Sequence, residues 1–328
     1  MEPLLPAENT AAAAHSFDVL QAAFENQFND HLFPPTPANL YNAIDYQLKS
    51  GGKRLRPVLC LMGNLLTEPL HLDAFLAANA LELFHNFTLA HSDIMAAAPL
   101  HRRRPALHVK YNVPTAILTG DTLLLYAYDY LNRIQGRYKP KIIQLFNDAA
   151  HAVCEGQQMS FDQENRTLNS LSYTDYLHKV ILENAVLLAV SLQMGAIIGG
   201  AGIADQEHIY SFGKNTGVAL QLQEDYRQAF GATEQEAPLQ YPKNSLLVKT
   251  YEWSNPEQRS RLQALLTLPA AEAANGLAQL YKACKADAWV LKEIARLQQM
   301  ARQHLGQISV PAVNKQPLLK LTDLLFDK

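Results

Sequence analysis

The sequence predicts an all-α protein, and three observations support this fold class. Apolar residues recur at spacings of three and four along almost the whole chain, which is the period of an amphipathic helix. Breakers such as FPPTP, SGG and NVP interrupt the pattern, as they do between helices. Strand-like alternation between turn signals is absent from the sequence. We therefore expect helices joined by turns, in a single domain that spans residues 1–328.

Ten segments are expected to be helical. In chain order they are roughly 17–32, 38–49, 54–66, 72–95, 113–135, 141–163, 173–199, 205–230, 256–268 and 271–305. The segments 72–95, 173–199 and 205–230 are apolar on more than one face, which is typical of helices in the middle of a bundle. Residues 231–244 lack this period and are expected to form a looser connection.

Composition excludes several classes of protein. The net charge of −3 gives no basic surface for nucleic acid. Cys60, Cys154 and Cys284 are widely spaced without a CxxC motif, so we expect buried, reduced thiols in a cytoplasmic protein. Residues 1–14 have no basic region followed by an apolar run, and a signal peptide is not expected. No window of about 18 uninterrupted apolar residues suggests a membrane span.

Two cationic stretches are candidates for binding an anion. In SGGKRLRP, Ser50 to Pro57, two glycines end one helix and three cations crowd the first turn of the next. Cations there oppose the helix dipole, so either an anion compensates them or the turn is simply solvated. The second stretch is HRRRP, where Arg102, Arg103 and Arg104 follow the helix 72–95. Surface arginine runs are common, so this stretch alone is weaker support.

Two helices carry polar groups on one face. On the helix 72–95 the spacing i, i+3, i+7, i+11 is occupied by His85, Thr88, Ser92 and Ala96. His85 therefore points towards the same side as Ser92, from about 10 Å earlier. On the helix 205–230 the spacing i, i+3, i+4, i+7 is occupied by Gln221, Glu224, Asp225 and Gln228. Such oxygens on the inner face of a bundle suit Mg²⁺, although a solvated or ion-paired pair of acids would give the same pattern.

Together these stretches resemble the trans-isoprenyl diphosphate synthases, the polyprenyl synthetase family. The resemblance covers most of the chain and is carried by LYNAIDYQLKSGGKRLRP, LELFHNFTLAHSDIM, HRRRPALH, TGDTLLLYAYDYL, EGQQMSFD and GVALQLQEDYRQAFG. It implies a bundle of about ten or more helices around a deep central cavity, in a homodimer. It also implies that isopentenyl diphosphate is joined to an allylic diphosphate, with Mg²⁺ ions held between two DDxxD motifs.

The resemblance implies two diphosphate sites that this sequence treats differently. The isopentenyl diphosphate site of the family falls on Lys53, Arg56, His85 and Arg102, and all the expected residue types are present. In the allylic site, Ser92 and Ala96 replace aspartates of the first motif and leave Asp93 alone. His101 stands where the family has an arginine that faces the allylic phosphate.

Further departures lie later in the chain. Glu183 and Asn184 stand where the family has a Lys-Thr pair, which reverses a charge beside the diphosphate. The second motif reads Glu224, Asp225 and Gln228, so one carboxylate is longer and another is neutral. The positions Gln157 and Gln221 match polar residues of the family pocket, and Lys243 is the remaining lysine after this motif. The candidate metal ligands and catalytic acids are thus Asp93, Glu224 and Asp225.

Three functional hypotheses follow from this pattern. The first is a prenyltransferase with weak or altered activity, using fewer Mg²⁺ ions and more basic contacts, and making short products if Phe87 limits chain length as the resemblance implies. The second is a catalytically inactive member that binds a diphosphate or regulates an active synthase in a heterodimer. The third, other carbocation chemistry such as cyclisation, needs the same metal-assisted ionisation, so the same departures count against it.

Overall fold

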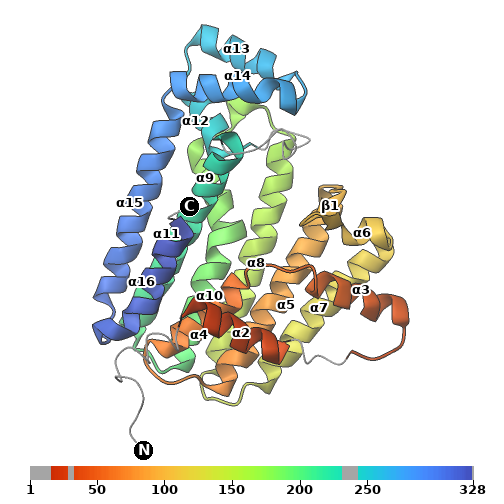
Figure 1. The fold of residues 1–328 in the computed structure, drawn as a ribbon, viewed down its shortest axis with the longest axis vertical. Coiled ribbons are helices and arrows are strands. Elements are labelled where there is room, and N and C mark those ends of the chain that lie inside the picture. The colour runs from red at the N-terminus through yellow and green to blue at the C-terminus, as the bar shows by residue number, and fades with distance from the viewer. Residues whose placement is uncertain (1–15, 29–32, 231–242, 327–328) are drawn as a thin grey trace, which may run out of the picture. The chain divides into compact units, whose positions relative to one another are not determined.

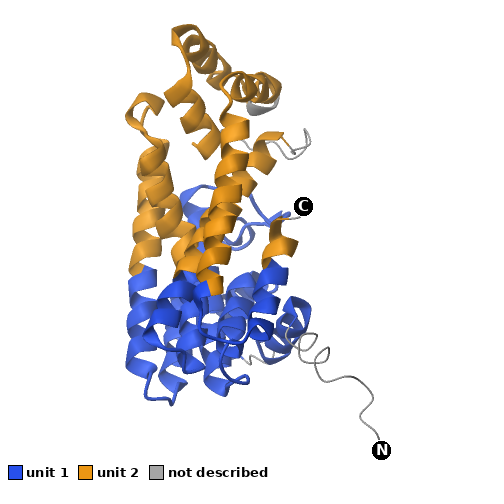
Figure 2. Cartoon of the chain, turned by 90° about the vertical axis from the view of Figure 1, so that its left-hand side faces the viewer, with its two compact units in different colours: residues 1–150, 187–210, 307–321 blue, residues 151–186, 211–306, 322–328 orange. Residues whose placement is uncertain are grey.

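The structure, a computed structural model, describes residues 16–28, 33–230 and 243–326. Within these residues the fold is helical except for one two-stranded hairpin, β1 (Leu100–His101) with β2 (Arg104–Pro105). Figure 1 shows the helices in chain order, and Figure 2 colours the two compact units into which the chain divides. The first unit comprises residues 1–150, 187–210 and 307–321, and the second comprises residues 151–186, 211–306 and 322–328.

The first unit contains the amino-terminal helices. These are α2 (Phe17–Phe28), α3 (Ala38–Leu48), α4 (Leu55–Leu65), α5 (Leu72–Met95), α6 (Leu107–Lys110) and α7 (Val113–Arg133). Most of α10 (Val186–Ile198) belongs to the same unit. Helices α4 and α10 approach closely, because a Cβ on Gly195 would lie 1.8 Å from the carbonyl oxygen of Cys60. The long helix α5 is buried on several faces, as its apolar sequence predicts.

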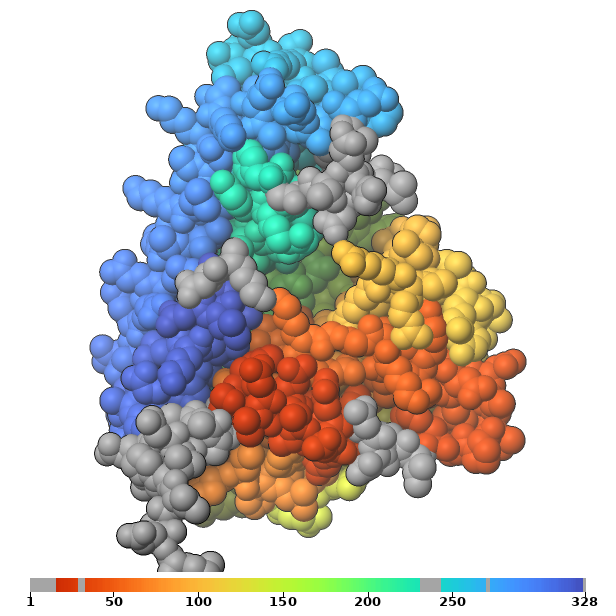
Figure 3. Space-filling model, in the orientation of Figure 1, coloured from red at the N-terminus to blue at the C-terminus, as the bar shows by residue number. Residues whose placement is uncertain are grey.

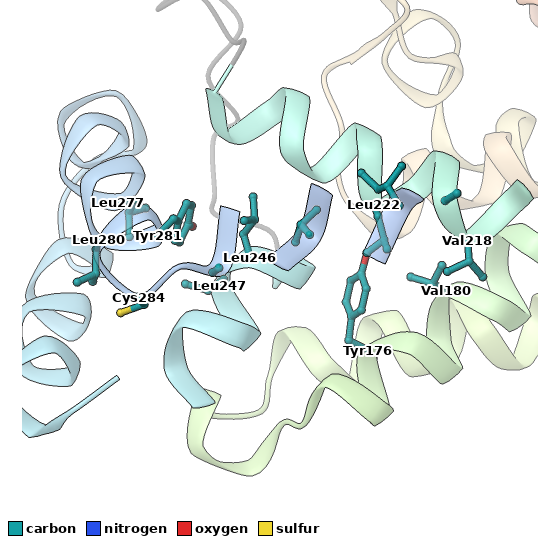
Figure 4. Close-up of a cluster of buried hydrophobic side chains, with 14 of the residues drawn as sticks. Tyr176, Val180, Val218, Leu222, Leu246, Leu247, Leu277, Leu280, Tyr281 and Cys284 are labelled. Atoms are coloured by element: carbon teal, nitrogen blue, oxygen red, sulfur yellow. The ribbon is translucent and has the colours of Figure 1, made fainter. Parts of the chain in front are cut away.

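The second unit has its own hydrophobic core. It contains α9 (Tyr173–Val180), the π-helical turn η2 (Ile181–Ala185), α12 (Ser245–Trp253), α13 (Pro256–Leu266) and α14 (Ala270–Ala283). It also holds most of α15 (Ala286–Gln307) and parts of α8 (Lys139–Glu164), α11 (Ile203–Phe230) and α16 (Ala312–Phe326). Figure 4 shows part of this core, with Tyr176 of α9 reaching towards Leu222 of α11.

The all-α class is confirmed, and most predicted helices are present, but several local features differ. The segment 271–305 is two helices rather than one, because Lys285 has a left-handed backbone (φ 59°) between α14 and α15. Helices α12 and α16 and the hairpin were not predicted. Most of the connection expected at 231–244 lies outside the described residues. Cys60 and Cys284 are buried free thiols as predicted, but Cys154 is exposed.

One segment resembles a membrane span by length and composition. Residues Tyr173–Ile198, which form α9, η2 and α10, have a mean hydropathy of 1.8 over an 18-residue window, and 72% of that window is buried inside the protein. A buried core helix passes the same test as a membrane span, so the expectation of no membrane span stays a prediction.

Candidate functional site

The first half of the candidate site begins at the turn between α3 and α4. Gly51 and Gly52 have φ values of 85° and 129°, a region that side chains with a Cβ avoid. Arg54, the residue before α4, also has a positive φ of 48°. Three positive φ values among four residues turn the chain sharply here, and the cations of the stretch differ in exposure, with Lys53 exposed and Arg54 buried.

Arg54 points into the protein. Its Nη1 donates to Glu82 Oε1 at 2.6 Å, and its Nη2 donates to the carbonyl oxygen of Leu48 at 2.7 Å. The side chains of Arg54 and Glu82 are only 6% and 4% exposed. A paired, buried charge of this kind holds helices together, so Arg54 belongs to the frame of the site.

Arg56 and His85 form the inner part of the cationic cluster. Arg56 Nη1 lies 3.0 Å from His85 Nε2, and because a guanidinium only donates, the imidazole proton is assigned to Nδ1. Burial, followed by the positive charges of Arg56 and Arg102, lowers the pKa of His85 well below its usual value. Burial is also the main cause that lowers the pKa of Arg56 to about 10. A neutral His85 thus lies against a charged arginine.

The β1–β2 hairpin brings Arg102 to the same place. Arg102 and Arg103 occupy its two-residue turn with φ values of 49° and 65°, a turn in which Asn and Gly are the usual residues. A Cβ built on Gly52 would lie 2.5 Å from Arg102 Nη1. The guanidinium therefore rests directly on the glycine turn, and a Cβ at Gly52 would require the end of the Arg102 side chain to shift.

One cation of the hairpin and one cation of α6 pack against Tyr46 of α3. The guanidinium of Arg104 and the ammonium of Lys110 each lie 4.3 Å from the ring centre of Tyr46, which is a cation–π distance. Arg104 also donates to the carbonyl oxygen of Lys49 at 2.9 Å. Figure 3 shows the hairpin and α6 (yellow) at the molecular surface next to α3 (orange-red). These cations anchor the hairpin, which holds Arg102 in place.

The predicted isopentenyl diphosphate residues are therefore brought together in one unit. Arg56 and His85 are in contact, Arg102 lies near enough for its charge to lower the pKa of both, and Lys53 is exposed in the glycine turn beside Arg102. Glu82, a nearby carboxylate, is occupied by Arg54. A cluster with surplus positive charge and inward-facing donors can bind an anion such as a diphosphate.

The remnant of the first acidic motif lies at the end of α5. Asp93 Oδ2 is 3.0 Å from His101 Nδ1, and the two side chains are 14% and 12% exposed. The distance is that of an ion pair, although the atoms do not meet the geometry of a hydrogen bond. Ser92 is half-buried and Ala96 is the exposed residue that ends the helix. The remaining acid of this motif is thus held by the residue that replaces an arginine.

Two other predicted residues of α5 make local contacts. The hydroxyl of Thr88 donates to the carbonyl oxygen of His85 at 2.8 Å. Phe87 packs against Phe84 and His91, with ring centres 5.6 Å and 4.7 Å apart. Phe87 therefore belongs to an aromatic cluster in the first unit, and its effect on product length stays a prediction.

In the second unit, the carboxylate of Asp225 is surrounded by donors. Its Oδ2 accepts hydrogen bonds from the hydroxyl of Tyr176 at 2.5 Å, from the backbone N–H of Ser245 at 2.9 Å and from the hydroxyl of Ser245 at 2.7 Å. Its Oδ1 accepts from the amide of Gln221 at 3.0 Å. The residue is 3% exposed, so all of these bonds are shielded from water.

Glu224, the other acid of this motif, faces solvent. Arg227 donates to both of its oxygens at 2.9 Å and 2.8 Å, and the amide of Gln228 donates at 2.9 Å. The bidentate arginine is the strongest common partner of a carboxylate. Gln228, which replaces an acid of the family motif, thus serves as a donor to Glu224.

Glu183 and Asn184, which stand where the family has a Lys-Thr pair, lie in the π-helical turn η2. Glu183 accepts a hydrogen bond from the hydroxyl of Ser160 at 2.7 Å, and its backbone passes so close to α8 that a Cβ on Gly156 would lie 2.5 Å from its nitrogen. Asn184 donates to Gln221 Oε1 at 3.1 Å. Gln157, the residue after Gly156 in α8, is half-buried.

Lys243 is engaged by the end of α8. Its Nζ donates to the carbonyl oxygens of Gln163 at 2.5 Å, Glu164 at 2.8 Å and Arg166. An ammonium group has three donors, and these carbonyls match that number. Unpaired carbonyls at a helix end require such donors, so the contacts of Lys243 are those of a helix cap.

Sequence reasoning missed the partners that occupy these groups. Tyr176, Ser245, Arg227 and Glu82 were not among the predicted site residues, and they contact Asp225, Glu224 and Arg54. No pattern within one helix could have revealed Tyr176 or Ser245, because they lie 49 and 20 positions from Asp225. Among the residues that the structure describes, no group of three or more His, Cys, Asp or Glu side chains is placed to hold a metal ion.

Comparison with known proteins gives matches over most of the chain. Residues 37–284 match the model of the family described as polyprenyl synthetase. A solved structure described as a geranylgeranyl pyrophosphate synthase is 33% identical, with a TM-score of 0.89 over 95% of this chain and 99% of that chain.

Curated relatives give similar matches. The chain is 36% identical to the geranylgeranyl diphosphate synthase of Methanosarcina mazei over 200 residues, 60% of this chain and 61% of that protein. It is 33% identical to the geranylgeranyl diphosphate synthase of Sulfolobus acidocaldarius over 67% of this chain and 69% of that protein. The first of these two relatives is thus matched over less than two thirds of its length.

Proposed function

Because the chain belongs to the polyprenyl synthetase family, we propose that it binds isopentenyl or another prenyl diphosphate and joins it to an allylic diphosphate at a strongly reduced rate. The contact between Arg56 and His85 carries the first half of the proposal. A neutral imidazole between arginines adds no charge repulsion and leaves the guanidinium groups to receive the anion. Lys53 and Arg102 complete this set of cations.

The second half of the proposal rests on the carboxylates. Mg²⁺ prefers six oxygen ligands in near-octahedral geometry and is bound through carboxylates with free lone pairs. Asp225 accepts four hydrogen bonds and Glu224 is paired with Arg227, which leaves Asp93, beside His101, as the one acid of the three with an oxygen that accepts no hydrogen bond. This donor set does not fit the Mg²⁺ cluster that the family resemblance implies.

Loss of that cluster explains the reduced rate that we propose. In this family Mg²⁺ would neutralise the diphosphate as it leaves the allylic substrate, and positioned charges of this kind are worth about 10²–10³ in rate each. The limiting case, no turnover at all, corresponds to a partner subunit that binds diphosphate and regulates an active synthase.

A second candidate is ordinary geranylgeranyl diphosphate synthase activity. It is favoured by the 36% and 33% identity to proteins with that description. Under this alternative the Asp93–His101 and Glu224–Arg227 pairs would open when substrate and Mg²⁺ bind. Phe87 would then limit the product to short chains.

We propose that the protein associates through α7, either with itself or with an active synthase. Four large apolar side chains of this helix are 41–66% exposed, namely Val113, Ile117, Leu118 and Leu125. Exposed apolar side chains gathered on one helix are typical of an interface. Light scattering of the wild type and of Leu118→Glu checks this, since a dimer that forms through α7 should dissociate in the variant.

Calorimetry and turnover together test the proposed function. Isopentenyl diphosphate should bind with the same affinity in Mg²⁺ and in EDTA, and Arg56→Ala should weaken binding about 100-fold. Arg133→Ala, an exposed arginine that packs on Tyr130 at 5.0 Å, is the matched control. With geranyl or farnesyl diphosphate added, elongation should be at least about 100-fold slower than that of the M. mazei enzyme.

The outcomes separate the candidates. Elongation in Mg²⁺ at the rate of the M. mazei enzyme would establish the second candidate and refute ours. Absence of any binding of isopentenyl diphosphate would refute both.

A further inference from the structure

The surroundings of Asp225 are unusual for a buried acid, because the hydrogen-bond donors that surround it are neutral groups. Tyr176, Ser245 and Gln221 supply four hydrogen bonds, and the residue is 3% exposed. A buried carboxylate is costly unless hydrogen bonds replace its hydration. Tyr176 and Ser245, which supply three of the four donors, are themselves buried, so these donors would lose their partner if the carboxylate were removed.

The number of donors matches the capacity of the carboxylate. A carboxylate offers about four lone-pair sites, and Asp225 accepts three hydrogen bonds at Oδ2 and one at Oδ1. A cation that coordinated both oxygens would have to displace the buried donors at Oδ2, and only one lone pair of Oδ1 is left without a donor. Competition with a hydrated Mg²⁺, which gives up its own water reluctantly, therefore favours the protein donors.

Two of the donors belong to the start of α12. Ser245 is the first residue of this nine-residue helix and gives Asp225 both its N–H and its hydroxyl. The side chain of the preceding residue, Asn244, accepts from the N–H of Leu247 at 2.9 Å. These are N–H groups that a helix leaves without partners in its first turn, and a negative charge there is also favoured by the helix dipole.

The hydrogen bonds continue from Asp225 to η2. Gln221 donates to Asp225 with its Nε2 and accepts from Asn184 with its Oε1. The amide of Gln221 can satisfy both neighbours in only one orientation. Because the carboxylate of Asp225 only accepts, it fixes the orientation of Gln221, and the Oε1 thereby turned to η2 accepts from Asn184, which replaces a residue of the family's Lys-Thr pair.

We propose that Asn184, Gln221, Asp225, Tyr176 and Ser245 form a hydrogen-bonded latch, in which Asp225 anchors the start of α12 to α9 and α11 instead of binding a divalent cation. The latch shares with the proposed function only the statement that Asp225 holds no Mg²⁺. It does not depend on diphosphate binding, so either proposal can fail alone.

Thermal unfolding and hydrogen exchange of the full chain test the latch. Asp225→Asn keeps the shape of the side chain but removes one acceptor and the charge, and it should lower the unfolding midpoint by roughly 3–8 °C. Amide exchange should accelerate in α12. Glu224→Gln is the matched control on the same helix, and it should leave both quantities close to the wild type because Glu224 faces solvent.

Added MgCl₂ or EDTA distinguishes the latch from a metal site. For a latch, neither should change the midpoint of the wild type or of the variants. A saturable rise with Mg²⁺ that Asp225→Asn abolishes would overturn the proposal, and so would a midpoint that Asp225→Asn leaves unchanged. A metal site of repelling acids would instead gain stability without Mg²⁺ when either acid is neutralised.

Tyr176→Phe provides a second variant in case Asp225→Asn does not fold. It removes one donor and keeps the ring in the core shown in Figure 4. It should accelerate exchange in α12 as well, and its effect combined with Asp225→Asn should be smaller than the sum of the two. Additive effects would show that the two residues act separately and would contradict the latch.

Discussion

Arg56 Nη1 lies 3.0 Å from His85 Nε2, whereas Arg54, two positions earlier, turns inward to Glu82. Neighbouring cations of one short motif thus serve different purposes. Arg56 contributes its guanidinium to the cationic cluster, and Arg54 forms a buried ion pair with Glu82.

Substitution of Arg54 should mainly lower stability, whereas substitution of Arg56 should mainly lower the affinity for diphosphate. Arg54→Ala leaves the buried carboxylate of Glu82 without its charged partner and with only the amide of Asn86 as a donor, and it should lower the free energy of unfolding by about 3–5 kcal/mol. Arg56→Ala relieves a buried cation of its desolvation, so stability should change little while affinity for isopentenyl diphosphate falls. Urea unfolding and calorimetry of both variants check this. Equal loss of stability in the two would contradict the division of roles.

The pKa of His85 predicts a pH dependence of stability. Because its pKa is lowered in the folded protein, the unfolded chain takes up more protons below the usual histidine value of about 6.5. Stability should therefore be complete above this pH and fall as the pH drops from about 6.5 towards the lowered pKa, by up to about 1.4 kcal/mol per pH unit.

His85→Gln supplies the control for this measurement, since Gln can still accept from Arg56 and does not titrate in this range. Urea unfolding between pH 5 and 8 should give a shallower acid slope for the variant. An unchanged slope would assign the pH dependence to other groups.

The glycine turn should control the position of Arg102. Gly51→Ala and Gly52→Ala both place a Cβ at positive φ and should cost about 1–3 kcal/mol of strain. Only the Cβ at Gly52 meets the guanidinium of Arg102, whereas nothing lies within 4 Å of the one at Gly51. Gly52→Ala should therefore weaken diphosphate binding more than Gly51→Ala. Equal affinities in calorimetry would exclude this contact as a determinant.

Restoring acids at the end of α5 should create a response to metal. Ser92→Asp together with Ala96→Asp adds two charges near Asp93 at a helix C-terminus, where each costs about 0.3–1 kcal/mol. The double variant should unfold earlier in EDTA and recover in Mg²⁺, while the matched Ser92→Asn, Ala96→Asn variant should respond to neither. A double aspartate variant that ignores Mg²⁺ would show that Asp93 and His101 remain paired.

The helices could be predicted because their period is local. The break between α14 and α15 could not, since Lys285 takes a left-handed conformation without the Gly or Asn that usually announces it. The family resemblance selected Arg56 for the cationic cluster and left Arg54 out, but the inward pairing of Arg54 with Glu82 could not be predicted, because Glu82 lies 28 positions away on another helix. The partners of Asp225 come from other helices, so only the fold reveals them.

The three hydrogen bonds from Lys243 to the end of α8 have a wider consequence. Together with the Glu224–Arg227 pair, they mean that carbonyl and carboxylate groups of the second unit are satisfied by side chains of the protein itself. A helical bundle that is stabilised by bound metal ions loses stability when these ions are removed. If Asp225 holds no divalent ion, as proposed, a chelator should leave the structure of this unit unchanged.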